Sequence, residues 1–204
     1  MREHIDVIIR NLSKRNINGH FFETADDAKE AILSWIPQDA TIGIGNSRTV
    51  KDMDISATLS SKGHIVYDKT TVQTERGKKL LKKKALMTDW YITGTNALAK
   101  SGHLVNIDHS GSRVAAMLYG PDNVIIVVGI NKIEENLDKA LERARNEAAP
   151  RNAIRAGASA PCIEAGRCVE CEGEHRICNA FVTVSGQSDA DRMRVVIINE
   201  ALGF

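Results

Sequence analysis

The hydrophobic residues of this chain follow helical and strand-like spacings in turn. In residues 2–15 apolar side chains recur every three or four positions, which is typical of an amphipathic helix. A strand-like run follows at 20–23, and Thr24 with Asp27 resembles a capping box that begins a helix ending at Pro37. Further along, the pattern predicts strands at 41–45, 64–67, 90–93, 123–128, 181–184 and 195–198, and helices at 46–59, 75–87 and 133–148. Strands that alternate with helices favour an α/β fold with a Rossmann-like, mostly parallel sheet.

Two regions depart from this alternation. Residues 103–108 and 113–119 are β-rich runs on either side of Ser110-Gly111, and we expect them to form an inserted β-hairpin. Pro150 is expected to end the helix over 133–148, because proline cannot continue a helix interior. Beyond it the chain has many turn residues and little periodicity. We therefore expect a single domain over residues 1–204, with a cysteine-rich metal-binding loop at 157–180.

Charge and composition narrow the class of protein. Lys and Arg number 27 against 26 Asp and Glu, and a net charge of +1 gives no electrostatic reason to expect nucleic acid as a partner. The basic run at 78–84 is typical of a solvated helix with one apolar stripe. Charges interrupt the apolar residues near the start of the chain, so the pattern predicts neither a signal peptide nor a membrane span. We expect a cytoplasmic protein, whose cysteines would not normally form disulfides.

All the cysteines lie in one segment with the spacing C-x5-C-x2-C-x6-C. The predicted metal ligands are Cys162, Cys168, Cys171 and Cys178. The central pair would converge on one ion from a tight turn, and Gly166 and Gly173 give the flanking backbone freedom to fold back. Four thiolates satisfy tetrahedral zinc and a four-iron cluster equally well, and His175 would be a substitute ligand in a zinc site. Spacing alone leaves iron–sulfur and zinc open.

Polar, glycine-containing turns follow three of the predicted strands, at 43–49, 93–96 and 129–132. Ligands of open α/β sheets bind beyond the carboxyl ends of the strands, so we expect these turns to bind a small organic anion. The alternative is that the same residues only form turns and cap helices. The predicted ligand-binding residues are Gly43, Gly45, Asn46, Ser47, Thr49, Thr93, Gly94, Thr95, Asn96, Arg113, Gly129 and Asn131.

Three residues are candidates for general acid or base catalysis: Glu75, Asp108 and Lys132. Asp108 and Arg113 flank the Ser110-Gly111 turn, where they would either form an ion pair or point towards the anion-binding edge. The sequence has no GxSxG elbow, no HExxH motif and no cysteine outside the cluster. A serine hydrolase, a zincin and a separate cysteine nucleophile are therefore not supported.

Several longer blocks add a family resemblance. They are GIGNSRT at 43–49, DWYITGTNALAKSGHLVNIDHSGSRVAA at 89–116, YGPDNVIIVVGINKI at 119–133, AAPRNAIR at 148–155, the cysteine loop and NEALGF at 199–204. Together they resemble the LUD-domain family (lactate utilization, formerly DUF162), and the cysteine loop is similar to that of its short members. The resemblance implies a fold of the NagB/RpiA/CoA-transferase-like superfamily, whose members bind phosphorylated sugars, CoA esters or folates at strand ends.

The resemblance also implies a function. Family members are associated with a cytoplasmic iron–sulfur and flavin system that oxidises L-lactate to pyruvate, which favours a 4Fe–4S cluster over zinc. We therefore expect a protein that binds a small organic anion and a cluster held by four cysteines, acts in oxidation of L-lactate or a related 2-hydroxy acid, and has other iron–sulfur or flavin subunits as partners. The alternative is an isomerase or transferase for a phosphorylated or CoA-linked substrate, with a structural zinc. Catalysis by the chain alone and its oligomeric state stay open.

Overall fold

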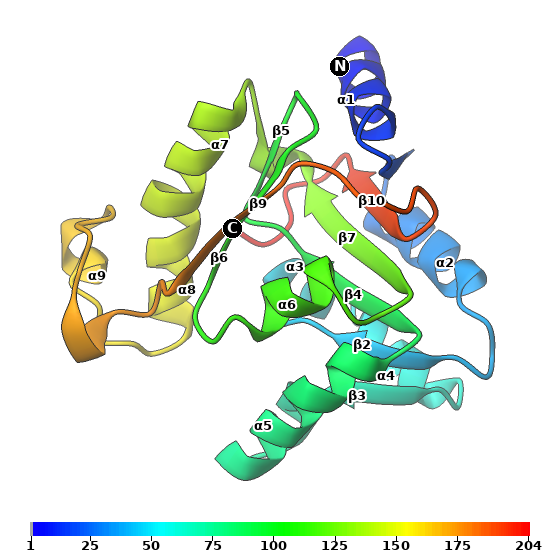
Figure 1. Ribbon diagram of the computed structural model, residues 1–204, viewed down its shortest axis with the longest axis horizontal. Coiled ribbons are helices and arrows are strands. Elements are labelled where there is room, and N and C mark those ends of the chain that lie inside the picture. The colour runs from blue at the N-terminus through cyan, green and yellow to red at the C-terminus, as the bar shows by residue number, and fades with distance from the viewer. Residues whose placement is uncertain (1) are drawn as a thin grey trace.

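A six-stranded parallel sheet forms the centre of the structure, which is a computed structural model describing residues 2–204 (Figure 1). Its strands lie in the order β1-β10-β7-β4-β2-β3. They are β1 (Asn18–Phe22), β2 (Thr41–Ile44), β3 (Ile65–Asp68), β4 (Trp90–Gly94), β7 (Asn123–Gly129) and β10 (Met193–Ile198). β7 is buried on both faces, which explains its uninterrupted apolar run. The α/β class and the mostly parallel sheet are confirmed.

Helices cover both faces of this sheet. They are α1 (Arg2–Ser13), α2 (Ala25–Trp35), α3 (Arg48–Asp52), α4 (Ile55–Ser61), α5 (Glu75–Lys84) and α6 (Ser112–Leu118). Three more helices lie outside the central sheet: α7 (Leu137–Arg143), α8 (Ala149–Arg155) and α9 (Cys162–Ala165). Along β7, Val124, Ile126 and Val128 pack in the core cluster that includes residues of α1 and α6. Ile125 and Val127 face the opposite cluster with α2, α3 and α4, as the alternation of a strand requires. Among residues 2–204, no helix has the length and apolar character to cross a membrane.

A second, four-stranded sheet lies beside the central one, in the order β8-β5-β6-β9. Its strands are β5 (Ala97–Ala99), β6 (Leu104–Asp108), β8 (Ile133–Glu134) and β9 (Ala180–Val184). The inserted hairpin therefore exists, but it joins β5 to β6. The expectation that residues 113–119 form its second strand was wrong, because they form α6 after Gly111, which has a left-handed backbone. The other neighbour of β6 is β9, which comes from beyond the cysteine loop.

Three predicted helix boundaries were also wrong. The helix expected at 133–148 begins only at Leu137, because Ile133 and Glu134 form β8. The helix expected at 46–59 is two helices, separated at Asp54, which has a positive φ of 51°. Pro150 does not end a helix: the chain passes from α7 through a π-helical turn at 144–148 into α8, with Pro150 in the first turn of α8. A proline is tolerated there because the π-helical turn before it already interrupts the regular α-helical hydrogen-bond pattern. The helix-capping prediction was right, since Thr24 accepts a hydrogen bond from the backbone N–H of Asp27.

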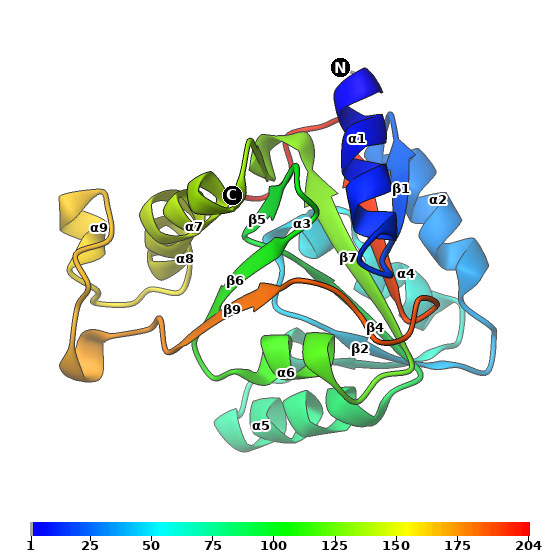
Figure 2. The same cartoon turned by 45° about the horizontal axis from the view of Figure 1, so that its top comes forward.

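The cysteine loop, residues 157–180, leaves the end of α8 and returns to β9. It lies beyond α7 and α8 at the left of Figure 2, away from the helices α1 and α2. It includes α9 and a 3-10 turn at 173–175. Its last residues rejoin the body, because the Asn179 N–H donates to the carbonyl oxygen of Asp108 at the end of β6. This attachment places the end of the loop against the carboxyl ends of the central strands.

Candidate functional site

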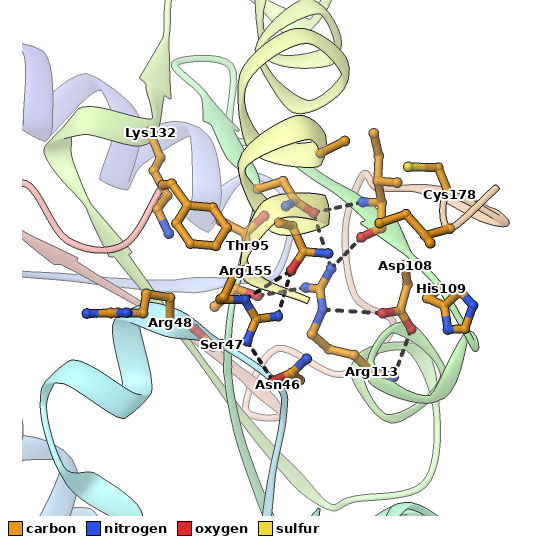
Figure 3. A pocket seen from close by; sticks show the side chains of 17 residues that line it. Asn46, Ser47, Arg48, Thr95, Asp108, His109, Arg113, Lys132, Arg155 and Cys178 are labelled. Carbon is orange, nitrogen blue, oxygen red and sulfur yellow. Dashed lines mark hydrogen bonds and ion pairs between the residues drawn. The ribbon is translucent and has the colours of Figure 1, made fainter. Parts of the chain in front are cut away.

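A small polar cavity of about 90 Å³ lies beyond the carboxyl ends of β2 and β4. The chain continues from β2 to β3 on one side of it, and the following strand, β4, lies on the other side. This reversal of strand order is the point of an open α/β sheet where ligands typically bind. The cavity is lined by predicted site residues from separate parts of the chain: Asn46, Ser47, Gly94, Thr95, Asn96, Asp108, Arg113, Lys132 and Cys178 (Figure 3).

Lys132 is the most deeply buried cation of this cavity, with only 3% of its surface exposed. Its Nζ donates a hydrogen bond of 2.8 Å to Thr49 Oγ1. Burial, followed by the nearby positive charges of Arg143 and Arg113, lowers the pKa of Lys132 from 10.5 to about 7. Near neutral pH this amine is therefore close to half protonated, and it is able both to attract an anion and to accept a proton.

Arg113 is fully engaged within the protein. Its guanidinium donates to the carbonyl oxygens of Gly94 and Ile107 and to the side-chain oxygens of Asn96 and Asn106. Its Nε lies 3.8 Å from Asp108 Oδ1, and burial lowers the pKa of Arg113 although the Asp108 charge opposes this shift. Because these bonds use both terminal nitrogens, Arg113 is suited to holding β4, β6 and α6 together around the cavity. Its positive charge still acts on an anion bound there.

Asp108 is half-buried at the end of β6 and faces the same cavity. Its Oδ2 accepts a hydrogen bond of 3.1 Å from the backbone N–H of Arg113. The Ser110-Gly111 turn beyond it leads into α6 instead of a strand, so Asp108 and Arg113 pair across a strand-to-helix turn. The two arrangements expected for this pair therefore occur together, because the residues interact with each other and also line the cavity.

Other predicted residues support the cavity without lining it. Thr49 holds Lys132, and Thr93 is fully buried with no hydrogen-bond partner for its Oγ1 among residues 2–204. Asn131 Oδ1 accepts from the backbone N–H of Leu202, which fastens the C-terminal segment over the strand ends. At Gly129 a Cβ would meet the carbonyl oxygen of Glu200 in that same segment.

Three predicted residues lie elsewhere. Gly43 is buried, and a Cβ at this position would collide with the Tyr91 ring. Gly45 does not line this cavity but lines two adjoining ones, which are described below. Glu75 is exposed in the first turn of α5 and forms a 2.8 Å ion pair with Lys78. The structure does not bring Glu75 to the cavity with Asp108 and Lys132, so nothing in the fold associates it with the same chemistry.

The sequence of this chain matches a known family over nearly its whole length. A family model described as the LUD domain matches residues 5–198. This chain belongs to the LUD-domain family. Membership implies a function related to lactate utilization. A comparison with curated protein sequences found no significant match.

Solved structures place this LUD domain among known folds. A DUF162 family protein from Deinococcus radiodurans is 15% identical, covers 97% of each chain and has a TM-score of 0.57, which shows a shared fold. Ribose 5-phosphate isomerase A from Neisseria gonorrhoeae is also 15% identical, but covers 56% of each chain with a TM-score of 0.34. The second likeness is too partial to support an argument about function.

The LUD domain also has cavity residues that the sequence did not single out. Arg155, at the end of α8, donates to Asn152 Oδ1 at 2.6 Å and to Asn46 Oδ1 at 3.2 Å, and burial lowers its pKa. Figure 3 shows Arg155 between Asn46 and Thr95. The remaining lining residues are Arg48, Ile107, His109, Ala149, Ile177 and Phe204. The block AAPRNAIR, which contributed to the family resemblance, was the one signal that pointed to Asn152 and Arg155.

The small cavity continues into a larger one of about 330 Å³. Asn46, Asp108, Arg113 and Arg155 line both. The larger cavity adds Lys69, whose pKa is lowered by burial and by the positive charge of Lys82. The LUD domain therefore presents several cations and one nearby carboxylate at this edge, which suits an anionic ligand.

The four cysteine thiols of the LUD domain lie close enough to affect one another. Burial raises the pKa of Cys178 to about 11, and the charges of Cys162, Cys168 and Cys171 add to this effect. Cys162 is buried in a small apolar cluster with Ala153 and Ala160. Among residues 2–204, no three His, Cys, Asp or Glu side chains are already arranged to hold a metal ion.

The loop backbone is fixed at several points. Arg176 donates to the carbonyl oxygens of Cys171 and Cys178, and Asn146 Oδ1 accepts from the N–H of Cys168. Glu170 has a positive φ of 51° and forms a 2.6 Å ion pair with Arg145. His175 is exposed and lies 3.8 Å from Glu174. The four cysteine thiols are the soft metal ligands that the loop offers. Four thiolates fit either zinc or a 4Fe–4S cluster.

Proposed function

We propose that this LUD-domain protein binds a small 2-hydroxy acid such as L-lactate in the 90 Å³ cavity, beside a 4Fe–4S cluster held by its four cysteines, and takes part in oxidation of that acid. One observation carries this proposal: Cys178 lines the same cavity as Lys132 and Asp108. A cluster on the cysteine loop would then adjoin the bound acid.

The cavity suits a short carboxylate. Lys132 supplies a positive charge at its floor, and Arg155 supplies another at its wall. Ser47 Oγ accepts from the N–H of Val50, which leaves its hydroxyl hydrogen to donate to a carboxylate oxygen. A cavity of this size holds a molecule of a few heavy atoms, and a larger substrate would extend into the adjoining space.

Oxidation of a 2-hydroxy acid to a 2-oxo acid releases two electrons and two protons. In the neutral fraction of the protein, which a pKa of about 7 makes large at physiological pH, the Lys132 amine would accept the hydroxyl proton while Arg155 holds the carboxylate. Asp108 is the second candidate, since it faces the same cavity. The cluster, when bound, would supply single-electron transfer. The hydrogen on C2 would leave with its electron pair as hydride to the flavin of a partner subunit, and the cluster would carry the electrons onward one at a time. Flavin and iron–sulfur subunits are therefore the expected partners.

The cluster is tested by purifying the protein anaerobically and measuring iron, sulfide and the visible absorption spectrum. We expect about four iron and four sulfide per chain. Cys178→Ser should lose most of both, whereas Val169→Ser, an exposed position in the same loop, should keep them. Colourless protein with stoichiometric zinc would overturn the iron–sulfur proposal.

The ligand is tested by calorimetric titration with L-lactate and pyruvate. Binding should weaken at least tenfold in Lys132→Met, because a charged hydrogen bond contributes about 1.5–3 kcal/mol. Lys14→Met, at an exposed lysine far from the cavity, serves as the control. Unchanged binding in Lys132→Met would show that the acid binds elsewhere.

The second candidate is an isomerase or transferase for a phosphorylated or CoA-linked substrate, with a structural zinc in the loop. Lys69 and Lys82 in the 330 Å³ cavity favour it, because they extend the cationic surface beyond what lactate needs. Thermal stabilisation by sugar phosphates or CoA esters but not by 2-hydroxy acids, together with bound zinc, would favour this function.

A further inference from the structure

A third cavity, of about 490 Å³, lies beyond the carboxyl ends of β2 and β3. It is bounded by α3 and α4 on one side and by the turn that follows β3 on the other. Its volume is within the range of roughly 300–1,000 Å³ that is typical of small-molecule sites. The lactate proposal makes no use of it.

Most residues that line this third cavity are polar, including Lys51, Asp54 and several serines and threonines, and three parts of the lining bear on the ligand. Val50 and Ala57 provide an apolar wall. Asp68 is a buried carboxylate at the last position of β3. Asn46 and Arg155 form the opposite end, where the cavity meets the small polar one. A matching ligand therefore combines an apolar ring, a neutral group that donates hydrogen bonds, and an anionic group that lies where the two cavities meet.

Asp68 has room for a ligand. The backbone N–H and the hydroxyl of Thr70 both donate to Oδ1, at 2.8 Å. Within residues 2–204 no hydrogen bond reaches Oδ2, although the side chain faces the cavity. In dinucleotide-binding sheets, an acidic residue about 20 positions after the glycine-rich turn accepts hydrogen bonds from ribose hydroxyls. Asp68 follows the turn at Gly45 by a similar distance and lies on the neighbouring strand.

We infer that the 490 Å³ cavity binds a nucleotide, with its base against Val50 and Ala57, its ribose diol on Asp68 and its phosphate towards Arg155. The phosphate would then face the anion cavity. A carboxylate at the ribose also disfavours a phosphate on the 2′ or 3′ oxygen, since two negative charges would meet. ADP and NAD⁺ should therefore bind, whereas NADP⁺ and coenzyme A should bind much more weakly.

Calorimetric titration of the full chain with ADP tests the inference. Asp68→Asn keeps an acceptor for Thr70 but replaces Oδ2 by an NH2 donor, and it should weaken ADP binding at least tenfold. Ala57→Leu, at an exposed position on the cavity wall, should also abolish binding by filling the space for the base. Asp39→Asn, an exposed aspartate at the opposite end of β2, should bind like the unchanged protein.

The outcomes separate this inference from the lactate proposal. Weakened ADP binding in both cavity variants, with L-lactate binding unchanged in Ala57→Leu, supports a nucleotide site. The inference is overturned by absence of ADP binding at millimolar concentration, by ADP binding that both variants leave unchanged, or by equal affinity for ADP and coenzyme A. Equal affinity for ADP and inorganic phosphate would also overturn it, because the base and ribose would then contribute nothing.

Discussion

Burial of the Lys132 amine should make the stability of this protein depend on pH in a specific direction. The pKa of Lys132 falls from 10.5 in the unfolded chain to about 7 in the folded one. A pKa difference of roughly 3.5, at about 1.4 kcal/mol for each pH unit, opposes folding by about 5 kcal/mol at pH values below 7. The unfolded state binds more protons between pH 7 and 10.5, so stability should rise with pH across that window. Near pH 9 the remaining cost is about 2 kcal/mol.

Lys132→Met removes the charge and keeps a side chain of similar length. Urea unfolding of both proteins near pH 6 and pH 9 would give the difference in their free energies of unfolding. The variant should gain stability relative to the unchanged protein, and the gain should be about 3 kcal/mol larger at pH 6 than at pH 9. Loss of the hydrogen bond to Thr49 and altered packing shift both values alike, so the change with pH isolates the charge.

Lys14→Met, at an exposed site, provides the matched control, and its effect should hardly change with pH. A stability difference between Lys132→Met and the unchanged protein that is the same at both pH values would refute the reasoning. Lys132 would then be fully charged in the fold, and its role as a proton acceptor would lose its basis.

Four further substitutions test other parts of the structure. Gly120→Ala should lower the free energy of unfolding, measured in urea, by several kcal/mol, because φ is 113° and a Cβ would collide with the Leu86 carbonyl. Gly111→Ala, which has open space around it, should lower it by only about 1 kcal/mol. Equal losses in the two variants would contradict this reasoning. Arg113→Met should cost about 3 kcal/mol in the same assay by leaving buried acceptors unpaired, and a cost below about 1 kcal/mol would show that the network contributes little. Arg155→Gln should weaken binding of inorganic phosphate several-fold in calorimetry with little change in unfolding, because a glutamine amide can still donate a hydrogen bond to Asn152 or Asn46. Unchanged phosphate binding would exclude Arg155 from the site.

The central sheet was predictable because its strands carry strong local patterns. β7 is a run of β-branched residues and β4 follows a clear helix, so neither depends on distant neighbours for its assignment. Residues 113–119 were assigned incorrectly for the opposite reason. Their apolar residues fit either a strand or a short helix, and the choice depends on β9, which occupies the edge of β6 that they would have used.

The position of the site was predictable because it follows from the parallel arrangement of the strands. Because such strands end at one edge, the turns containing Asn46, Thr95 and Lys132 had to converge, and the structure brings them together. Arg155 was missed because Pro150 was expected to end the helix, and the continuation into α8 is what carries Arg155 over β2. Glu75 was proposed only because it is acidic. No sequence pattern shows that its side chain is exposed on α5, away from the cavity.

The position of β10 in the sheet has a consequence for synthesis of the protein. β10 lies between β1 and β7, so residues 18–22 have no partner strand until residues 193–198 have been made. During synthesis on the ribosome, β1 and one edge of β7 therefore stay without their partner strand until the α7–α8 region, the cysteine loop and β10 have been made. Contacts between such distant segments slow folding and leave open strand edges that favour aggregation. The cysteine loop is thus made before the central sheet can close, so the metal proposed above would meet its ligands while β1 and β7 still lack the strand between them.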